Sequence, residues 1–209
     1  MPSFPVHLAV ADMLAENIGV QNKADFFLGC IAPDSVNHKG FASRELRYGA
    51  HIRSTDYDLW KKQLAEFYIN NKQAFSNSID YLKGYLFHCI TDIAWDEAVQ
   101  PQLFAYLQRN GALSRDEITE LKWQELFRFN SLVINSAHFT SSVCLLEKAQ
   151  PQAIATVTAQ QVSDYRDYVV NDYKDKISSQ PPEFLNMAHV QACAQRTLEL
   201  YGQLIQKRI

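Results

Sequence analysis

The sequence predicts an all-α fold, built as a multi-helix bundle. Apolar residues recur at helical spacing in most segments, and the alternating patterns typical of strands are nearly absent. Only seven glycines and seven prolines interrupt the 209 residues, mostly at expected helix boundaries. With 47% hydrophobic and 21% charged residues, the composition is that of an ordinary globular protein. The length fits one large domain, residues 1–209.

The first part of the chain predicts three helices and one irregular segment. A proline near the start of residues 5–16 has the fixed φ that favours a helix beginning there. A second helix is predicted over Lys23–Ile31, ending before Pro33. Residues 37–55 contain two glycines and several charges, so we expect a loop. A third helix is predicted over Asp56–Asn71.

A long central helix is predicted over residues 78–100, ending at Pro101. One of its faces carries four apolar residues at helical spacing: Leu82, Leu86, Ile90 and Ile93. Three aromatic residues add bulk on other sides: Tyr81, Tyr85 and Trp95. A helix that is apolar on nearly all sides belongs in the middle of a bundle.

The second half of the chain predicts three more helices. The capping-box pattern Ser114-x-x-Glu117 indicates a long helix that reaches about His138 or beyond. A further helix is indicated by residues at helical spacing: Val162, Tyr165, Val169, Tyr173 and Ile177. The Ser- and Pro-rich residues 178–182 predict a turn, and a final helix is predicted over residues 183–206. No internal repeat stands out.

Charge and cysteine usage favour a cytoplasmic protein. The net charge of −3 and the pI near 6.1 do not indicate a nucleic-acid or anionic-membrane partner. No apolar run is long enough to span a bilayer, and the first residues lack the pattern of a signal peptide. The four cysteines are widely spaced without a CxxC pair, so we expect buried thiols, although one disulfide is compatible with the sequence. The sequence does not indicate an oligomeric state.

His88 and Asp92 are the most informative pair in the sequence. They lie four residues apart within an apolar helix, so their side chains share one face, about 5–6 Å apart at Cβ. Burying both without a partner would be costly. A metal ion between them and a plain buried hydrogen bond are both compatible with this spacing.

Three earlier residues could complete a metal site with this pair. His7 shares the inward stripe of the first predicted helix, Asp34 follows Pro33, and His51 ends the irregular segment. Taken singly, these residues are also explained as a core histidine, a turn residue and a surface histidine. Taken together, the five side chains supply three imidazole nitrogens and two carboxylates, which are ligands that zinc accepts.

Three segments, in this order along the chain, carry a resemblance to a known family. They are His7 on its helix; Phe27-Leu28-Gly29-Cys30-Ile31-Ala32-Pro33-Asp34, followed by His51; and Gly84-Tyr85-Leu86-Phe87-His88-Cys89-Ile90-Thr91-Asp92. Together they resemble the zinc-dependent phospholipase C family, whose superfamily includes the fungal single-strand nucleases. The resemblance covers roughly the first half of the chain. It implies a helical bundle around a zinc cluster and hydrolysis of phosphoesters.

The resemblance also implies roles for individual residues. It implies one zinc ion bound by Asp34, His51, His88 and Asp92, with His7 and Asp92 holding part of a neighbouring site. The family's later ligands have no counterparts, because Trp95-Asp96-Glu97 stands where another histidine is expected. We therefore expect one or two ions, of zinc or another divalent transition metal. Asp96 is a candidate additional ligand; the alternative is a solvated carboxylate near the helix end.

The sequence thus predicts a metal-dependent phosphoester hydrolase of phospholipase C type. A metal-activated water would attack a phosphodiester or phosphomonoester, with Asp34 as both ligand and catalytic base. Any of three nearby arginines, Arg44, Arg47 and Arg53, could neutralise phosphate, or could be a solvated loop residue. The substrate would be a small phosphoester or a phospholipid, and no basic, aromatic-rich groove indicates nucleic acid.

Two other classes of protein remain compatible with the sequence. One is a non-enzymatic helical protein with a structural or vestigial metal site. The other is a scaffold bundle in which His88 and Asp92 form a plain hydrogen bond.

Overall fold

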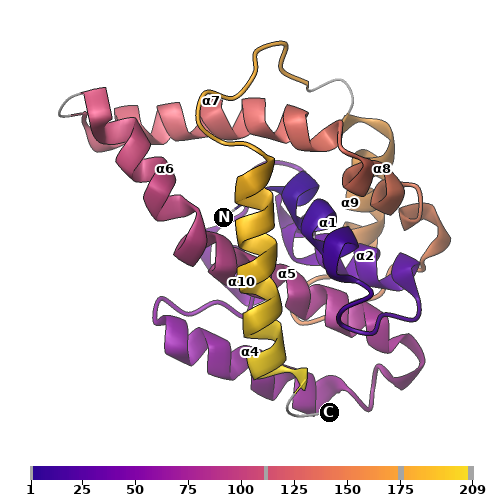
Figure 1. The fold of residues 1–209 in the computed structure, drawn as a ribbon. Helices are drawn as coiled ribbons and strands as arrows, with labels where there is room; N and C mark the ends of the chain where they lie inside the picture. The colour runs from indigo at the N-terminus through magenta and orange to yellow at the C-terminus, as the bar shows by residue number, and fades with distance from the viewer. Residues whose placement is uncertain (1, 111–112, 174–176, 207–209) are drawn as a thin grey trace.

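Helices make up all of the regular secondary structure in the computed structural model, which describes residues 2–110, 113–173 and 177–206 (Figure 1). The all-α prediction is confirmed, with no β-strand among these residues. The α-helices are α1 (Phe4–Leu14), α2 (Lys23–Ile31), α3 (Arg44–Ala50), α4 (Tyr57–Asn71), α5 (Ile79–Ala98), α6 (Gln100–Leu107), α7 (Arg115–Ile134), α8 (Ala137–Val143), α9 (Ala159–Asn171) and α10 (Met187–Leu204). The 3-10 helices are η1 (Ala32–Asn37), η2 (Ser76–Ser78), η3 (Gln108–Asn110) and η4 (Leu146–Lys148).

Local capping explains where the predicted helices α2 and α4 begin. The side chain of Asn22 accepts a hydrogen bond from the backbone N–H of Asp25, and α2 spans the predicted residues. Asp56 likewise accepts from the N–H groups of Asp58 and Leu59, so α4 begins one residue later than predicted. In both helices a side chain satisfies N–H groups that have no partner within the first turn.

The predicted loop over residues 37–55 is wrong, because it contains α3. Ser43 caps this helix by accepting from the N–H of Leu46, and the glycine within it does not prevent a helix of seven residues from forming. A bend precedes α3 at Gly40, whose φ of +115° suits glycine. The polar composition of the segment did not indicate this helix, whose C-cap is His51.

The second half differs from the prediction at three helix ends. The capping box at Ser114 is confirmed, but α7 ends at Ile134 because Ser136 caps a new helix, α8. Helix α9 ends at Asn171, and the predicted continuation over residues 174–176 lies outside the described residues. Helix α10 begins at Met187 instead of residue 183, after an Asn186 cap. Helix α5 ends at Ala98, and helix α6, which begins at Gln100 and has Pro101 in its first turn, was not predicted.

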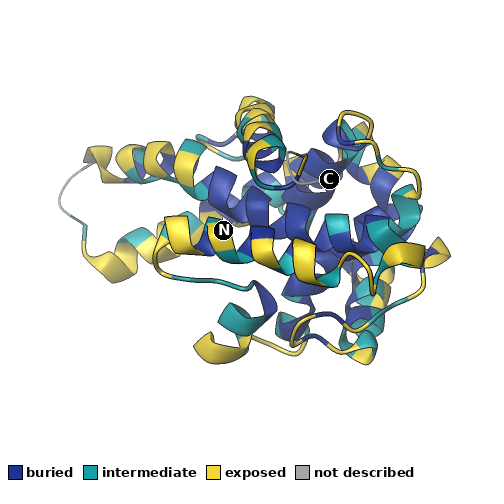
Figure 2. Cartoon of the chain, turned by 90° about the horizontal axis from the view of Figure 1, so that it is seen from below, coloured by how far each residue is buried: buried dark blue, intermediate teal, exposed yellow. Residues whose placement is uncertain are grey.

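Helix α5 lies at the centre of the bundle, as its apolar sequence predicted. It packs against α1, α2, α4 and α10, and α10 crosses in front of it in Figure 1. Buried residues gather along these middle helices, whereas exposed residues lie on the outward faces (Figure 2). With the exception of Ala65, the buried apolar side chains of the described residues form one contiguous cluster. No described helix is both long and apolar enough to cross a bilayer.

Two glycines allow α2 and α5 to cross at close range. A Cβ atom at Gly29 would overlap the backbone carbonyl oxygen of Tyr81. A Cβ atom at Gly84 would overlap that of Phe26. The close crossing brings the end of α2 against the middle of α5, where the candidate site lies.

Candidate metal centre

Five ligand-type side chains from four parts of the chain meet in the middle of the bundle. His7 comes from α1, Asp34 from η1 and His51 from the residue after α3. His88 and Asp92 come from α5. Four of the five are buried almost completely, whereas the side chain of Asp34 is 14% exposed. The structure therefore brings together all five residues that the sequence singled out, and we call them the His/Asp cluster.

The donor atoms of the His/Asp cluster lie at separations that suit a small cation. Nε2 of His51 lies 3.2 Å from Nε2 of His88 and 3.4 Å from Oδ1 of Asp34. The oxygens of Asp92 approach to 3.7 Å from His51 and 3.4 Å from Nε2 of His7. Ligands bound tetrahedrally at about 2.0–2.2 Å from zinc are about 3.3–3.6 Å apart. Two groups could hold a metal ion: His7/His88/Asp92 and Asp34/His51/His88.

Backbone carbonyls fix the orientation of two imidazole rings. Nδ1 of His88 lies 2.7 Å from the carbonyl oxygen of Cys30, and Nδ1 of His51 lies 2.8 Å from that of Arg47. Because a carbonyl oxygen only accepts, Nδ1 carries the proton in both rings, and in the neutral rings Nε2 presents a lone pair to the cluster. Two such lone pairs 3.2 Å apart repel each other unless a metal ion, or a proton on one of the two nitrogens, lies between them.

The remaining two members leave polar atoms unsatisfied in the core. Within the described part of the chain, neither carboxylate oxygen of Asp92 and neither ring nitrogen of His7 makes a hydrogen bond with good geometry. The His7 ring stacks on that of His88, with centroids 3.7 Å apart. Each such buried polar atom costs about 1–3 kcal/mol or more of folding free energy when it has no partner. A metal ion bound by Asp92 and by one ring nitrogen of His7 would give these atoms partners, so the residues fit a metal.

The pKa shifts of Asp34, Asp92 and His88 favour the protonation states that metal ligands need, whereas that of His51 favours a protonated ring in the absence of a metal. Burial alone would raise the pKa of Asp92, but the neighbouring histidines hold it well below its usual value. The pKa of Asp34 is lowered in the same way, chiefly by His51. Burial, together with His7, lowers the pKa of His88 to about 3, so its ring is neutral. Burial opposes a charge on His51, yet Asp34 and Asp92 raise its pKa above the usual value.

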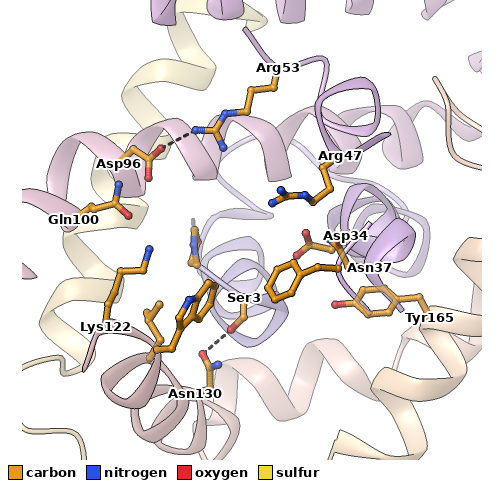
Figure 3. A pocket seen from close by; sticks show the side chains of 14 residues that line it. Ser3, Asp34, Asn37, Arg47, Arg53, Asp96, Gln100, Lys122, Asn130 and Tyr165 are labelled. Atoms are coloured by element: carbon orange, nitrogen blue, oxygen red, sulfur yellow. Dashed lines mark hydrogen bonds and ion pairs between the residues drawn. The ribbon is translucent and has the colours of Figure 1, made fainter. Parts of the chain in front are cut away.

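A pocket of about 410 Å³ opens beside the cluster and reaches it at Asp34 (Figure 3). It is lined by Pro2, Ser3, Asp34, Asn37, Phe41, Arg47, Arg53, Asp96, Gln100, Lys122, Trp123, Leu126, Asn130 and Tyr165. Arg47, Arg53 and Lys122 extend their charged ends into it from different sides. Burial lowers the pKa of Lys122, although Asp96 opposes this shift. Arg44 does not line the pocket and instead contacts Tyr48.

Asp96 lies in the wall of this pocket and belongs to neither metal-holding group. It forms an ion pair with Arg53 at 3.5 Å and accepts a hydrogen bond from the hydroxyl of Tyr57 at 2.8 Å. Two of the other histidines also lie elsewhere. His138 pairs with Asp12, and His189 takes part in the cap of α10.

A sharp turn after α3 places His51 in the cluster and Arg53 in the wall of the pocket. Ile52 has φ of +50°, in the left-handed region that β-branched residues rarely adopt. The N–H of Arg53 donates to the carbonyl of Tyr48 at 2.8 Å, which closes the turn. As a result His51 joins the cluster while Arg53, two residues later, lines the pocket.

Sequence reasoning missed the pocket wall formed by α7. Lys122, Trp123 and Asn130 lie far along the chain from the cluster and match no motif. The carbonyls of Cys30 and Arg47 were missed as well, because every residue has a backbone carbonyl and the sequence does not indicate which of them accept from a histidine. The helical periodicity of α7 could have indicated that these residues share one face, but not which helices they meet.

No family model, curated protein or solved structure matches the chain.

Proposed function

We propose that the protein is a metal-dependent phosphoester hydrolase of phospholipase C type. The observation that carries the proposal is that Asp34 belongs both to the His/Asp cluster and to the pocket. Catalytic zinc sites keep one coordination position open for water or substrate, so they need such an opening. The order of the motifs around His7, Asp34, His51 and His88, which resembles that of zinc-dependent phospholipase C, supports the same reaction.

Zinc is the metal that the donor set favours. Asp34, His51, His88 and Asp92 would hold one ion, and His7 with Asp92 would contribute to a neighbouring position. Mixed imidazole and carboxylate ligation suits zinc, and other divalent transition metals also accept it. When bound, the metal would supply Lewis acidity toward a phosphoryl oxygen and would lower the pKa of a water molecule to about 7.

The pocket supports a negatively charged substrate. Arg47, Arg53 and Lys122 bring three cationic groups to its walls, against the carboxylates of Asp34 and Asp96. The guanidinium groups match the geometry of phosphoryl oxygens, and a lysine acts as a point charge beside them. Cations around the phosphoryl group stabilise the charge that accumulates during its transfer.

Asp34 would act at the floor of the pocket. Its ionised carboxylate would take a proton from the attacking water as the new P–O bond forms. The P–O bond to the leaving alcohol then breaks, and the alcohol oxygen takes up a proton from solvent. The substrate would be a small phosphodiester or phosphomonoester, or the headgroup of a phospholipid.

A structural metal site in a non-enzymatic protein is the second candidate. One observation favours it: four of the five cluster side chains are at most 1% exposed. Structural zinc sites are closed in this way, and catalytic sites keep a position open. The pocket at Asp34 favours the hydrolase.

Metal analysis and activity assays test the two candidates. The protein, purified without a polyhistidine tag, is analysed for bound metals before and after zinc loading. It is then assayed on p-nitrophenyl phosphate, bis-p-nitrophenyl phosphate and phosphatidylcholine. Stoichiometric metal with hydrolysis that chelators abolish supports the hydrolase. Stoichiometric metal without hydrolysis of any of the three supports the structural site, and failure to take up metal excludes both.

A further inference from the structure

A charged pair in the pocket wall lies outside the His/Asp cluster and has no part in holding a metal. Nη2 of Arg53 lies 3.5 Å from Oδ2 of Asp96, whose side chain is only 4% exposed. The hydroxyl of Tyr57, on α4, donates to the same oxygen at 2.8 Å. Burial and Asp96 raise the pKa of Tyr57 to about 12, so its phenol keeps the proton that it donates. Asp96 is therefore held from a second helix while it contacts Arg53.

Aromatic rings hold the guanidinium of Arg53 as well. Its central carbon lies 4.9 Å from the ring of Trp60 and 5.6 Å from that of Tyr48. Trp60 is fully buried, and its indole N–H donates to the carbonyl of His51 at 3.0 Å. Arg47 rests instead beside Phe41, whose side chain is 77% exposed. Of the two pocket arginines, Arg53 thus has the more buried support.

We propose that Arg53 binds the phosphoryl group of the substrate and that Asp96 is the positioning residue that orients it. This inference rests on the proposed function and assigns the anion-binding group of that same pocket. A guanidinium carries five N–H donors in a planar fork, enough to contact a carboxylate and a phosphoryl group together. An arginine already held in place loses less conformational freedom when it binds an anion.

Neutralising Asp96 should change the affinity of the pocket for an anion, and the direction of the change depends on the role of this carboxylate. If Asp96 only adds negative charge to the pocket, removing that charge strengthens the binding of an anion. If Asp96 orients Arg53, the same change weakens binding of the anion, because the guanidinium of Arg53 is no longer held in the orientation that contacts it. Asp96→Asn is suited to the test because the amide oxygen can still accept from Tyr57.

The experiment measures binding of inorganic phosphate by calorimetry, with zinc-loaded and with chelator-treated protein. Arg53→Ala should weaken binding by about tenfold or more, since a charge-assisted hydrogen bond contributes about 1.5–3 kcal/mol. Arg53→Lys should recover part of the loss, because it restores the charge but not the fork. Asp96→Asn should weaken binding severalfold, and Tyr57→Phe should do so to a smaller extent. Arg44→Ala, on the neighbouring helix and outside the pocket, is the matched control and should bind like the wild type.

Several results would overturn the proposal. They are unchanged binding in Arg53→Ala, an equal loss in Arg44→Ala, tighter binding in Asp96→Asn, and no phosphate binding by the wild type in either form. Circular dichroism establishes whether each variant is folded. If Arg53→Ala does not fold, Arg53→Lys provides the test in its place. Binding is measured without turnover, so a wild type that binds phosphate through Arg53 but hydrolyses nothing contradicts the proposed function alone. Hydrolysis that persists undiminished in Arg53→Ala contradicts the role of Arg53 alone.

Discussion

Gly29 and Gly84 face each other where α2 crosses α5, and this contact sets the distance between the two helices. The residue after Gly29 is Cys30, whose carbonyl accepts from Nδ1 of His88, one turn beyond Gly84 on α5. The hydrogen bond is 2.7 Å long. Because neither glycine has a side chain, the helices come close enough for Cys30 to orient His88, the histidine that both metal-holding groups share.

Gly84→Ala should lower the free energy of unfolding by about 3 kcal/mol, because its Cβ would overlap the carbonyl of Phe26 and force the helices apart. It should also weaken zinc binding, since His88 would lose its alignment with Cys30. Urea denaturation and zinc titration measure the two effects. Gly202→Ala is the matched control: it lies within α10 in ordinary contact with Gln206, so it should be neutral or stabilising by up to about 1 kcal/mol. Equal stabilities for the two variants would contradict the close crossing.

Zinc should raise the melting temperature of the wild type, because a ligand that binds only the folded state stabilises it. The gain is about 2.7 kcal/mol at a hundred times Kd. His88→Ala removes the ligand shared by both groups, so it should abolish the zinc response and lower the stability of the protein. Thermal melts with zinc and with a chelator measure both. His138→Ala, whose imidazole pairs with Asp12 away from the cluster, should respond like the wild type. A full zinc response in His88→Ala would remove this residue from the site.

Glu125→Ala should destabilise the protein by about 3 kcal/mol. The buried carboxylate of Glu125 accepts hydrogen bonds of 2.7–2.9 Å from the backbone N–H groups of three consecutive residues, Glu183, Phe184 and Leu185. These are charge-assisted bonds, and their loss leaves partly buried donors without an acceptor. Chemical denaturation measures the change. Glu120→Ala, on the same helix but exposed, removes an acceptor for the side chain of Gln124 and should change stability by less than about 0.5 kcal/mol.

Glu97 should stabilise the fold at neutral pH and lose this effect in acid. It bridges Lys61 on α4 and Arg196 on α10 at 2.8 and 2.7 Å. Burial opposes its ionisation, but the two cations lower its pKa below the usual value. A lowered folded-state pKa means that the contribution is complete above the unfolded pKa and disappears as the pH falls through the folded one.

Glu97→Gln should therefore cost about 0.5–1 kcal/mol at pH 7, the range for a solvent-accessible ion pair. The difference from the wild type should vanish at a pH below the lowered pKa of Glu97. Urea denaturation at several pH values measures it. Glu66→Gln, which breaks only the exposed pair with Lys62, should have no measurable effect at any pH.

Local chemistry made most helices predictable. The Asn22 cap and Pro33 delimit α2 within the sequence itself, and the Ser114 capping box does the same for the start of α7. Helix α3 was missed because its polar residues resemble a loop, and Ala50 is the only one of its residues that is buried. The start of α10 was misplaced because Asn186 caps the helix at Met187, while residues 183–185 lie before it and donate their N–H groups to Glu125 on α7.

The centre of the site was predictable and its pocket was not. His88 and Asp92 share a helix face because of their spacing alone, and the motif order linked them to His7 and Asp34. The opposite wall comes from α7, and only tertiary packing brings Lys122 to the pocket. The pairing of Asp96 with Arg53 likewise depends on the turn after α3, which residue types alone did not indicate.

The left-handed backbone at Ile52 makes one rigid connection between His51 and Arg53. A non-glycine residue at positive φ costs about 1–3 kcal/mol and persists only where its surroundings hold it. The backbones of His51 and Arg53 are therefore held in one fixed relation to each other. A cation that fixes His51 should therefore also fix Arg53 in its anion-binding position, and an anion on Arg53 should steady His51. Such thermodynamic linkage is reciprocal, so zinc should tighten phosphate binding by the same factor by which phosphate tightens zinc binding.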